Sequence, residues 1–352
     1  MKKIVLALSL CSAIMADPFT AAPGGKARGM AGAFTAVSNT TSAAYYNPAG
    51  TASLKNNKNE ITFITLGYNQ NALESSKFMS DRQVESFTDV MPDIYFDMGM
   101  ISSKFGFSYM INNMTLVTSE DKFFNSSVGT IGFGYSVNDS LQIGATLIMN
   151  SLLAQTASLF HEVDDYSKID PFIFGFALGA KYEAYSSVED SLNIAASYRI
   201  GAKDESHNTS NYNKFATGIP DKLSLGINYN RYLSGGSLSL DANYDIIYVD
   251  GVTSVDDRNI ESRFGETTTM SFGADFAMPS FMIRAGYSVS DIARTNGDDW
   301  GNEIMSFGVA LPVNSNILEA SIEKRTYDFK QPEGKEDSIL LTVSYHFVIT
   351  KQ

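Results

Sequence analysis

Residues 131–149 read IGFGYSVNDSLQIGATLIM. Apolar side chains occupy every second position on both sides of Asn138-Asp139-Ser140, and glycine, serine, threonine and glutamine stand between them. A side-chain period of two is typical of a β-strand with one apolar face, and a short Asn/Asp/Ser linker is typical of a tight turn. The stretch therefore predicts a β-hairpin whose two faces differ in polarity.

The same alternation recurs along the chain after residue 58 and predicts about fourteen strands. Most runs are about ten residues or longer, which suits a tilted strand that crosses a bilayer, whereas strands of soluble sandwiches are usually about five or six residues. The predicted strands are 60–69, 92–102, 104–114, 127–137, 141–155, 169–183, 191–201, 221–231, 237–249, 268–278, 281–290, 303–313, 317–328 and 337–348.

The connections between these runs alternate in length. Those after even-numbered strands are short, as at Asn138-Asp139-Ser140, whereas those after odd-numbered strands are mostly long. The predicted long connections are 70–91, 115–126, 156–168, 202–220, 250–267, 291–302 and 329–336. This sorting is expected when one end of every hairpin faces the periplasm and the other faces outside. It favours a transmembrane antiparallel β-barrel over a soluble secreted sandwich, whose connections mix lengths.

The two faces of the strands fit a barrel in the outer membrane of a Gram-negative bacterium. One face carries Leu, Ile, Val, Phe and Ala, which suits contact with outer-membrane lipid, and the other carries Gly, Ser, Thr and Asn, which suits a polar lumen. Tyrosines stand near strand ends, where interfacial girdles are expected; they are Tyr135, Tyr182, Tyr198, Tyr229, Tyr248 and Tyr345.

Residues 1–16 are predicted to be a signal peptide. Lys2 and Lys3 precede a short apolar run, and Ala16 is the expected cleavage site. A lipoprotein anchor at Cys11 is the alternative, but Leu10 stands where a small residue is wanted. Cleavage changes the net charge from −13 to 24 − 39 = −15. This acidity argues against nucleic acid as a partner, because phosphates require Lys and Arg.

The segment between the signal peptide and the first strand does not alternate. Residues 17–58 are rich in Gly and Ala, and Ser42 is positioned to cap a short helix that ends before Pro48. Asn47-Pro48-Ala49-Gly50 reads as a turn. A fourteen-stranded barrel encloses more space than its own side chains fill, so we expect 17–58 to form a plug (hatch) inside the barrel of residues 59–352.

The sequences GKARGMAGAF (25–34) and AAYYNPAG (43–50) resemble the N-terminal signature of the FadL-type superfamily of outer-membrane proteins. That superfamily includes long-chain fatty-acid transporters, PorV-like subunits of type IX secretion and TraF-like barrels. The resemblance implies fourteen strands and a hatch, and it assigns to the hatch motif Gly29, Gly32, Asn47, Pro48, Ala49 and Gly50. In the transporters the ligand leaves through a gap beside a kink in the third strand. The third predicted strand here contains Gly106, to which no kink is assigned.

Charged residues on the inward face are candidate lumen groups. Arg199 and Arg284 could hold a ligand carboxylate, since an arginine fork suits one. Alternatively they pair with inward acids, and Asp241, Asp245 and Asp275 are the available ones. Pairing with these acids is the favoured interpretation.

No cofactor, metal site or catalytic group is predicted. His161, His207 and His346 are scattered, no cysteine remains after cleavage, and no nucleophile-elbow motif is present. The loop acids Asp256-Asp257 and Asp298-Asp299 could bind divalent cations, but solvated acidic loops are the favoured interpretation.

The leading functional hypothesis is passive uptake of hydrophobic small molecules such as long-chain fatty acids. Apolar pairs predicted at loop tips and a strand end could form a groove for such a ligand or pack over the barrel mouth; they are Phe78-Met79, Phe123-Phe124, Leu159-Phe160 and Leu152-Leu153. The alternative is a non-transport barrel, a scaffold or subunit in surface secretion or assembly, which would bind a surface or secretion protein. A barrel enzyme is disfavoured.

Overall fold

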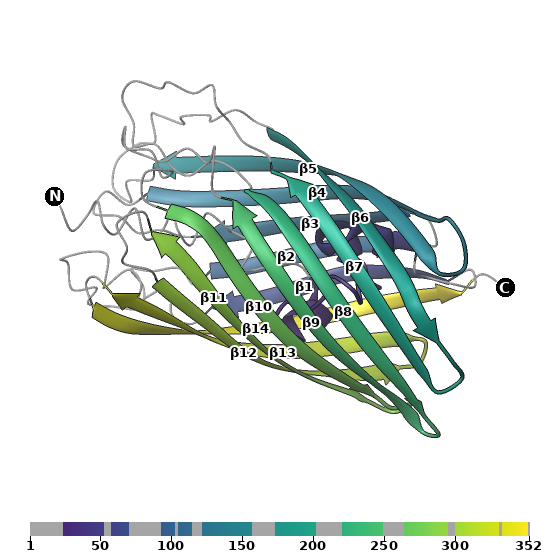
Figure 1. The fold of residues 1–352 in the computed structure, drawn as a ribbon. Helices are drawn as coiled ribbons and strands as arrows, with labels where there is room; N and C mark the ends of the chain where they lie inside the picture. The colour runs from purple at the N-terminus through teal and green to yellow at the C-terminus, as the bar shows by residue number, and fades with distance from the viewer. Residues whose placement is uncertain are drawn as a thin grey trace.

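The computed structural model describes residues 24–52, 58–69, 93–102, 105–114, 122–156, 173–201, 220–248, 264–294, 300–330 and 333–350. In these ranges fourteen strands form a closed barrel in which each strand pairs with its sequence neighbours and β1 pairs with β14 (Figure 1). The strands are β1 (Lys58–Asn69), β2 (Asp93–Ile101), β3 (Phe105–Met114), β4 (Lys122–Ser136), β5 (Leu141–Thr156), β6 (Ile173–Ser186), β7 (Asp190–Ile200), β8 (Asp221–Leu233), β9 (Gly236–Tyr248), β10 (Phe264–Ala277), β11 (Met282–Arg294), β12 (Trp300–Val313), β13 (Asn316–Lys330) and β14 (Glu333–Thr350).

Every described strand pairing is antiparallel, which confirms the expected all-β architecture. The stretch 131–149 forms the end of β4, a turn and most of β5. In that turn Asn138 Oδ1 accepts hydrogen bonds from the backbone N–H groups of Ser140 and Leu141 at 2.9 and 2.8 Å. The asparagine thus fixes the hairpin locally, as its turn propensity predicts.

Connection lengths follow the predicted alternation for most of the barrel. At one end, which we call the short-turn end, hairpins close over residues such as 234–235 and 314–315. The segments at the opposite, long-loop end lie largely outside the described residues. The prediction of a loop at 329–336 is wrong, since β13 and β14 continue to Lys330 and Glu333 and leave two residues between them.

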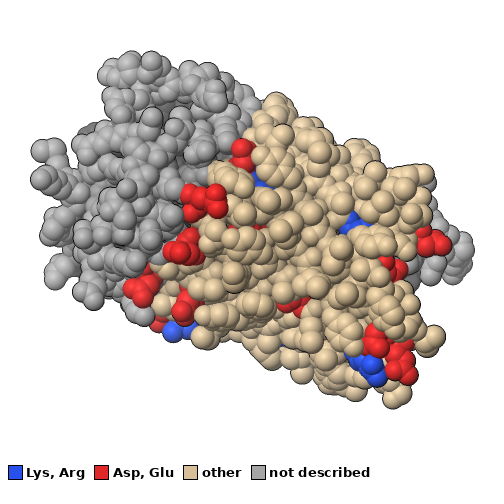
Figure 2. Space-filling model, viewed as in Figure 1, with Lys and Arg blue, Asp and Glu red and all other residues tan. Residues whose placement is uncertain are grey.

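The outer surface of the barrel carries large apolar side chains. Phe133, Leu147, Phe176, Leu225 and Phe307 are each between 41 and 60% exposed although they lie in mid-strand. Figure 2 shows this band with few charges, and Lys, Arg, Asp and Glu gather toward the barrel ends. Because a monomeric soluble protein does not expose so continuous an apolar belt, lipid must cover it. The belt supports the expected location in the outer membrane.

Residues 24–52 lie inside the barrel, and we call them the luminal segment (Figure 1, purple). They comprise the short helices α2 (Gly25–Gly29) and α3 (Ala43–Tyr46) and the 3-10 helix η2 (Pro48–Ala52). Among the described residues no helix is long and apolar enough to cross a membrane. Ser42 precedes α3 as predicted, but its hydroxyl pairs with that of Thr40 at 2.9 Å and does not cap the helix.

Candidate functional site: the luminal segment and its wall

The luminal segment contacts opposite parts of the wall with its two ends. Helix α2 lies against β11–β14, whereas α3 and η2 lie against β3–β6. Nearly all of its side chains are buried, and Phe34, Met30 and Val37 form a small apolar cluster within it, with Tyr46 packed edge-on against Phe34 at 5.2 Å. The segment is therefore a packed unit that crosses the lumen.

Inward-facing glycines of the wall receive the segment. A Cβ on Gly144 or Gly179 would overlap Pro48 or Asn47, and a Cβ on Gly286 would overlap the backbone of Met30. Other wall glycines approach the segment in the same way; they are Gly106, Gly132, Gly134, Gly226, Gly273 and Gly308. Because glycine alone allows backbone to approach this closely, these residues shape the inner wall to the segment.

The Asn47-Pro48 step joins α3 to η2, and Asn47 is fully buried. Its amide nitrogen donates to the carbonyls of Thr35 at 3.1 Å and Ala180 at 3.2 Å, and its Oδ1 accepts the N–H of Ala49 at 3.1 Å. One side chain thus forms the predicted turn and ties it to both the luminal segment and β6. Gly50 follows because a Cβ there would overlap the backbone of Ser38.

The two other glycines of the motif serve α2. Gly29 ends the helix, and a Cβ there would lie 3.4 Å from Gly308 Cα and from Arg284 Cβ. Gly32 follows with φ of +81°, a conformation that side-chain-bearing residues rarely adopt.

The third strand shows no irregularity at Gly106. No register shift interrupts the pairing of β3 with β2 or β4 there, and the inward side of Gly106 faces Thr51 of the luminal segment.

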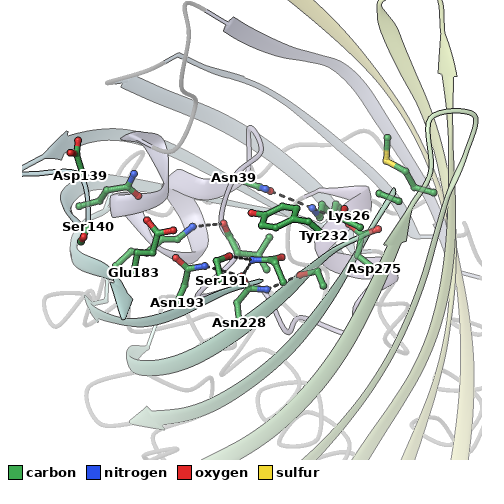
Figure 3. Close-up of a pocket in the computed structure, with 18 residues that line it drawn as sticks. Lys26, Asn39, Asp139, Ser140, Glu183, Ser191, Asn193, Asn228, Tyr232 and Asp275 are labelled. Atoms are coloured by element: carbon green, nitrogen blue, oxygen red, sulfur yellow. Dashed lines mark hydrogen bonds and ion pairs between the residues drawn. The ribbon is translucent and has the colours of Figure 1, made fainter. Parts of the chain in front are cut away.

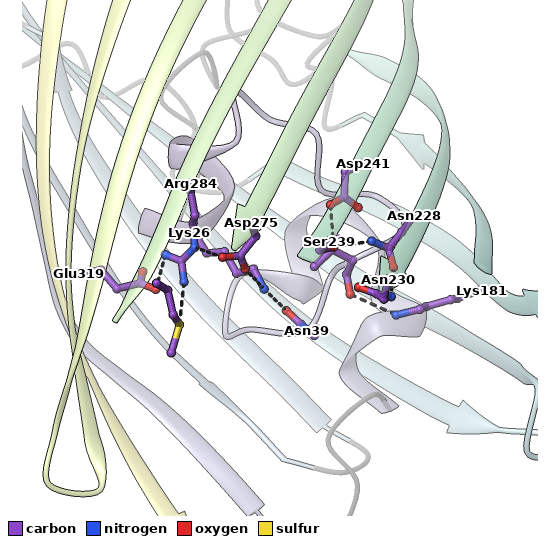
Figure 4. Close-up of polar contacts among 12 residues, drawn as sticks. Lys26, Asn39, Lys181, Asn228, Asn230, Ser239, Asp241, Asp275, Arg284 and Glu319 are labelled. Carbon is purple, nitrogen blue, oxygen red and sulfur yellow. Dashed lines mark hydrogen bonds and ion pairs between the residues drawn. The ribbon is translucent and has the colours of Figure 1, made fainter. Parts of the chain in front are cut away.

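Helix α2 is held by a chain of buried charges (Figure 4). Lys26 Nζ lies 3.0 Å from Asp275, which Arg284 also approaches at 3.4 Å. Arg284 then pairs with Glu319 at 2.6 Å, and Glu319 lies 3.0 Å from His346 Nε2. Arg284 thus pairs with Asp275, one of the three acids named as candidate partners for the inward arginines. Each charge has an opposite partner, as burial requires.

Glu319 was not among the predicted site residues. The charged residues on the inward face of its strand are the sequence signal that could have identified it. Glu319, Glu323 and Arg325 alternate along β13 and all face inward. The Glu323 carboxylate forms ion pairs with Arg325 at 2.8 Å and with Arg28 of α2 at 3.7 Å. The charged face of this strand therefore provides the second set of anchors for α2.

Arg199 contacts the α3 side of the segment. It donates to Tyr45 Oη and to the carbonyl of Pro220, both at 3.2 Å, and its guanidinium lies 5.6 Å from the Tyr45 ring centroid. The expected acid partners are engaged elsewhere. Asp245 pairs with Lys222 at 2.9 Å, and Asp241 accepts from Ser239 Oγ at 3.0 Å.

Two of the cavities among the described residues flank the luminal segment. The short-turn pocket, of about 360 Å³, is lined mainly by amides, hydroxyls and charged groups, including Lys26, Asn193, Asn228 and Ser239 (Figure 3). The long-loop pocket, of about 90 Å³, lies on the other side of the segment and includes Arg28, Lys222 and Asp245. Neither of these two cavities is hydrocarbon-lined.

Several other predicted groups can be placed. Phe123-Phe124 and Leu152-Leu153 lie within β4 and β5, so the expectation that the first pair stands in a loop is wrong. Phe78-Met79, Leu159-Phe160, His161, His207, Asp256-Asp257, Asp298-Asp299 and the signal peptide 1–16 lie outside the described residues. Within the described ranges, no group of three or more His, Cys, Asp or Glu could hold a metal.

The fold of this chain was compared with those of known proteins. No protein-family model matches the chain, and no curated protein matches its sequence. The monoaromatic hydrocarbon channel CymD superposes with a TM-score of 0.63 at 13% identity, covering 93% of this chain and 98% of its own. The toluene transporter TodX of P. putida gives 0.59 at 13%, covering 94% and 99%, and a FadL homologue of Pseudomonas aeruginosa gives 0.53 at 12%, covering 93% and 98%.

Proposed function

Since the chain has the barrel fold of the FadL-type channels, we propose that it is an outer-membrane channel for the passive uptake of hydrophobic small molecules. The observation that carries the proposal is a closed barrel with an apolar exterior and an anchored luminal segment across its bore. An open diffusion pore for polar solutes would leave the bore clear. A crossed bore suits a channel that selects its solute before passage.

Two classes of apolar substrate are proposed. The first is monoaromatic hydrocarbons, and the second is long-chain fatty acids. Two structurally similar proteins support the first, since CymD is a monoaromatic hydrocarbon channel and TodX a toluene transporter. The resemblance of residues 25–34 and 43–50 to the superfamily that includes the long-chain fatty-acid transporters is the basis for the second. Apolar burial at about 25 cal/mol per Å² would supply the binding energy, with no covalent chemistry.

The test uses the full mature chain refolded in lipid vesicles. A fluorescent long-chain fatty acid, toluene and glucose are presented in parallel, and binding and entry into the vesicle are measured. Entry of one or both apolar probes faster than into protein-free vesicles, without faster glucose entry, supports the proposal. Absence of binding and entry for both apolar probes, in protein shown to be folded, overturns it.

A second candidate function is a scaffold or subunit for surface secretion or assembly. The observation that favours it is the firm attachment of the luminal segment, which Lys26, Arg28, Asn47 and Arg199 tie to the wall. The larger of the two described cavities beside it is mainly polar. Cross-linking in the native outer membrane followed by purification in mild detergent distinguishes the two. A stoichiometric protein partner together with no apolar transport would favour the scaffold.

A further inference from the structure

The short-turn pocket lies between the luminal segment and the turns at the short-turn end of the barrel (Figure 3). Ser140, in the turn after β4, and Tyr232, near the end of β8, stand on the side of the turns, whereas Val37 and Asn39 belong to the luminal segment. The cavity volume of about 360 Å³ lies within the range of small-ligand sites, about 300–1,000 Å³. The pocket is therefore large enough to hold a small molecule at the barrel mouth.

Five side chains form a chain of hydrogen bonds that runs from this pocket into the wall (Figure 4). Asn193 and Asn230 each donate to Asn228 Oδ1, at 3.2 and 2.6 Å. Asn228 donates to Ser239 Oγ at 2.6 Å, and Ser239 donates to Asp241 Oδ2 at 3.0 Å. Asp241 is 6% exposed, and a carboxylate only accepts hydrogen bonds. The buried acid thereby sets the direction in which every amide of the chain points.

This direction leaves two amide oxygens available to a ligand. Asn193 and Asn230 use their N–H groups within the wall, and the Oδ1 atom of each accepts no hydrogen bond from any described residue. Asn39 complements them, because its Oδ1 faces Lys26 at 3.5 Å while its N–H groups donate to no described residue. The pocket thus presents acceptors and donors on uncharged groups.

The charged groups of the pocket already have protein partners. Lys26 Nζ lies 3.0 Å from Asp275, and Lys181 Nζ donates to the carbonyl of Val37 at 3.1 Å. Over the described ranges no group of three or more His, Cys, Asp or Glu could hold a metal. A hydrocarbon is also disfavoured, because apart from Tyr232 the apolar lining residues are only Val37, Ala277 and Met282. The lining therefore suits a neutral polar ligand better than an ion or an apolar molecule.

We propose that the short-turn pocket binds a neutral saccharide of one or two rings. A sugar hydroxyl both donates and accepts, so it matches the free oxygens of Asn193 and Asn230 and the free N–H groups of Asn39. The C–H face of a sugar ring packs against aromatic rings, and Tyr232 lines the pocket with its side chain 50% exposed. The proposal goes beyond hydrophobic uptake, because it concerns a different ligand in a polar pocket.

The test is the binding of maltose and of N,N′-diacetylchitobiose to the full mature chain, held in a detergent that contains no sugar. Titration calorimetry measures the binding. We expect at least one disaccharide to bind with a Kd between about 0.1 and 10 mM, since the contacts are few and uncharged. A preference for diacetylchitobiose, which carries the acetamido groups of cell-wall glycans, supports a glycan end as the ligand, and a preference for maltose supports a free sugar.

Two substitutions test whether the sugar binds in this pocket. Asn230→Ala removes one free acceptor, and Tyr232→Ala removes the exposed ring, so each is expected to weaken binding at least about threefold. Asn302→Ala and Tyr185→Ala are the matched controls and should leave Kd within about twofold. Asn302 lines the long-loop pocket, and Tyr185 is 55% exposed near the short-turn end of β6 without lining the pocket.

Absence of binding for both disaccharides up to about 10 mM, in protein shown to be folded, overturns the proposal. So do equal losses in the pocket variants and their controls, or unchanged binding in the folded variants Asn230→Ala and Tyr232→Ala. If Asn230→Ala does not fold, Asn193→Ala removes the other free oxygen, and the same readings apply. Because these readings use only sugar binding, they do not depend on whether apolar probes enter vesicles.

Discussion

At the scale of single residues, the wall glycines decide whether the luminal segment fits. Gly144 faces inward on β5, and a Cβ there would overlap the carbonyl of Pro48. We expect Gly144→Ala to destabilise the folded protein by about 1–3 kcal/mol, because the added methyl overpacks a contact between two backbones. Unfolding in denaturant, with proteolysis of residues 24–52 as a second readout, measures the effect.

Gly235→Ala is the control for that substitution. Gly235 lies in the turn between β8 and β9, where an added Cβ meets no atom within 4 Å. Its free energy of unfolding should change by less than about 0.5 kcal/mol. Equal effects of the two substitutions would show that the fit to Pro48 is not what Gly144 provides.

The sequence predicts part of this residue-scale arrangement. The turn at Asn47-Pro48 follows from local chemistry, because Asx side chains bond nearby backbone and proline ends a helix. The bond from Asn47 to the carbonyl of Ala180 joins residues 133 positions apart, and no local pattern encodes it. The inward glycines can be recognised in the sequence as small residues, but their role becomes clear only when the position of the luminal segment is known.

At the scale of elements, helix α2 is held to the wall by charge. Lys26 and Asp275 are 14% and 7% exposed, whereas the ion pair of Lys324 and Asp337 on β13 and β14 is 52% and 47% exposed. We expect a double-mutant cycle of Lys26→Met and Asp275→Asn to give a coupling of about 0.5–3 kcal/mol, because the buried pair is poorly screened. Denaturant unfolding in detergent measures it.

The exposed pair serves as the comparison. The cycle of Lys324→Met and Asp337→Asn should give a coupling of about 0–1 kcal/mol, which added salt reduces further. If the buried pair coupled no more strongly than the exposed one, the charge chain would not be what holds α2 in place.

Strand positions follow closely from the alternation of side chains, and the exceptions have a physical cause. The predicted strand 337–348 begins at Glu333 in the structure, and its start is the charged sequence EGKED. Beyond the bilayer both faces of a strand meet water, so the period of two disappears while the backbone pairing of Lys330 with Glu333 continues. The sequence marks where a strand contacts lipid more reliably than where it ends.

At the scale of the whole molecule, the apolar exterior fixes the barrel in its bilayer. Leu147 lies in the middle of β5 and is 43% exposed on the outer face. We expect Leu147→Arg to destabilise the folded protein in lipid by about 2–4 kcal/mol, since a cation at the middle of the bilayer loses its hydration. The folded fraction in bilayers, read from gel mobility before and after heating, measures the loss.

Val188→Arg places the same charge at a turn tip, where the side chain is 95% exposed. We expect this variant to fold as the unaltered protein does, within about 0.5 kcal/mol. A comparable loss in both variants would mean that the belt around Leu147 does not contact lipid.

The pairing of β1 with β14 joins the first and last strands of the sheet, so the order of the assembly steps matters. Until that pair forms, the wall is an open sheet, and residues 24–52 can settle on its glycines from the side. Once it has formed, the only ways in are the two mouths. Because the segment precedes β1 in the chain, the strand pair that closes the barrel lies beside its point of attachment. A barrel that closes too early leaves its own N-terminus outside.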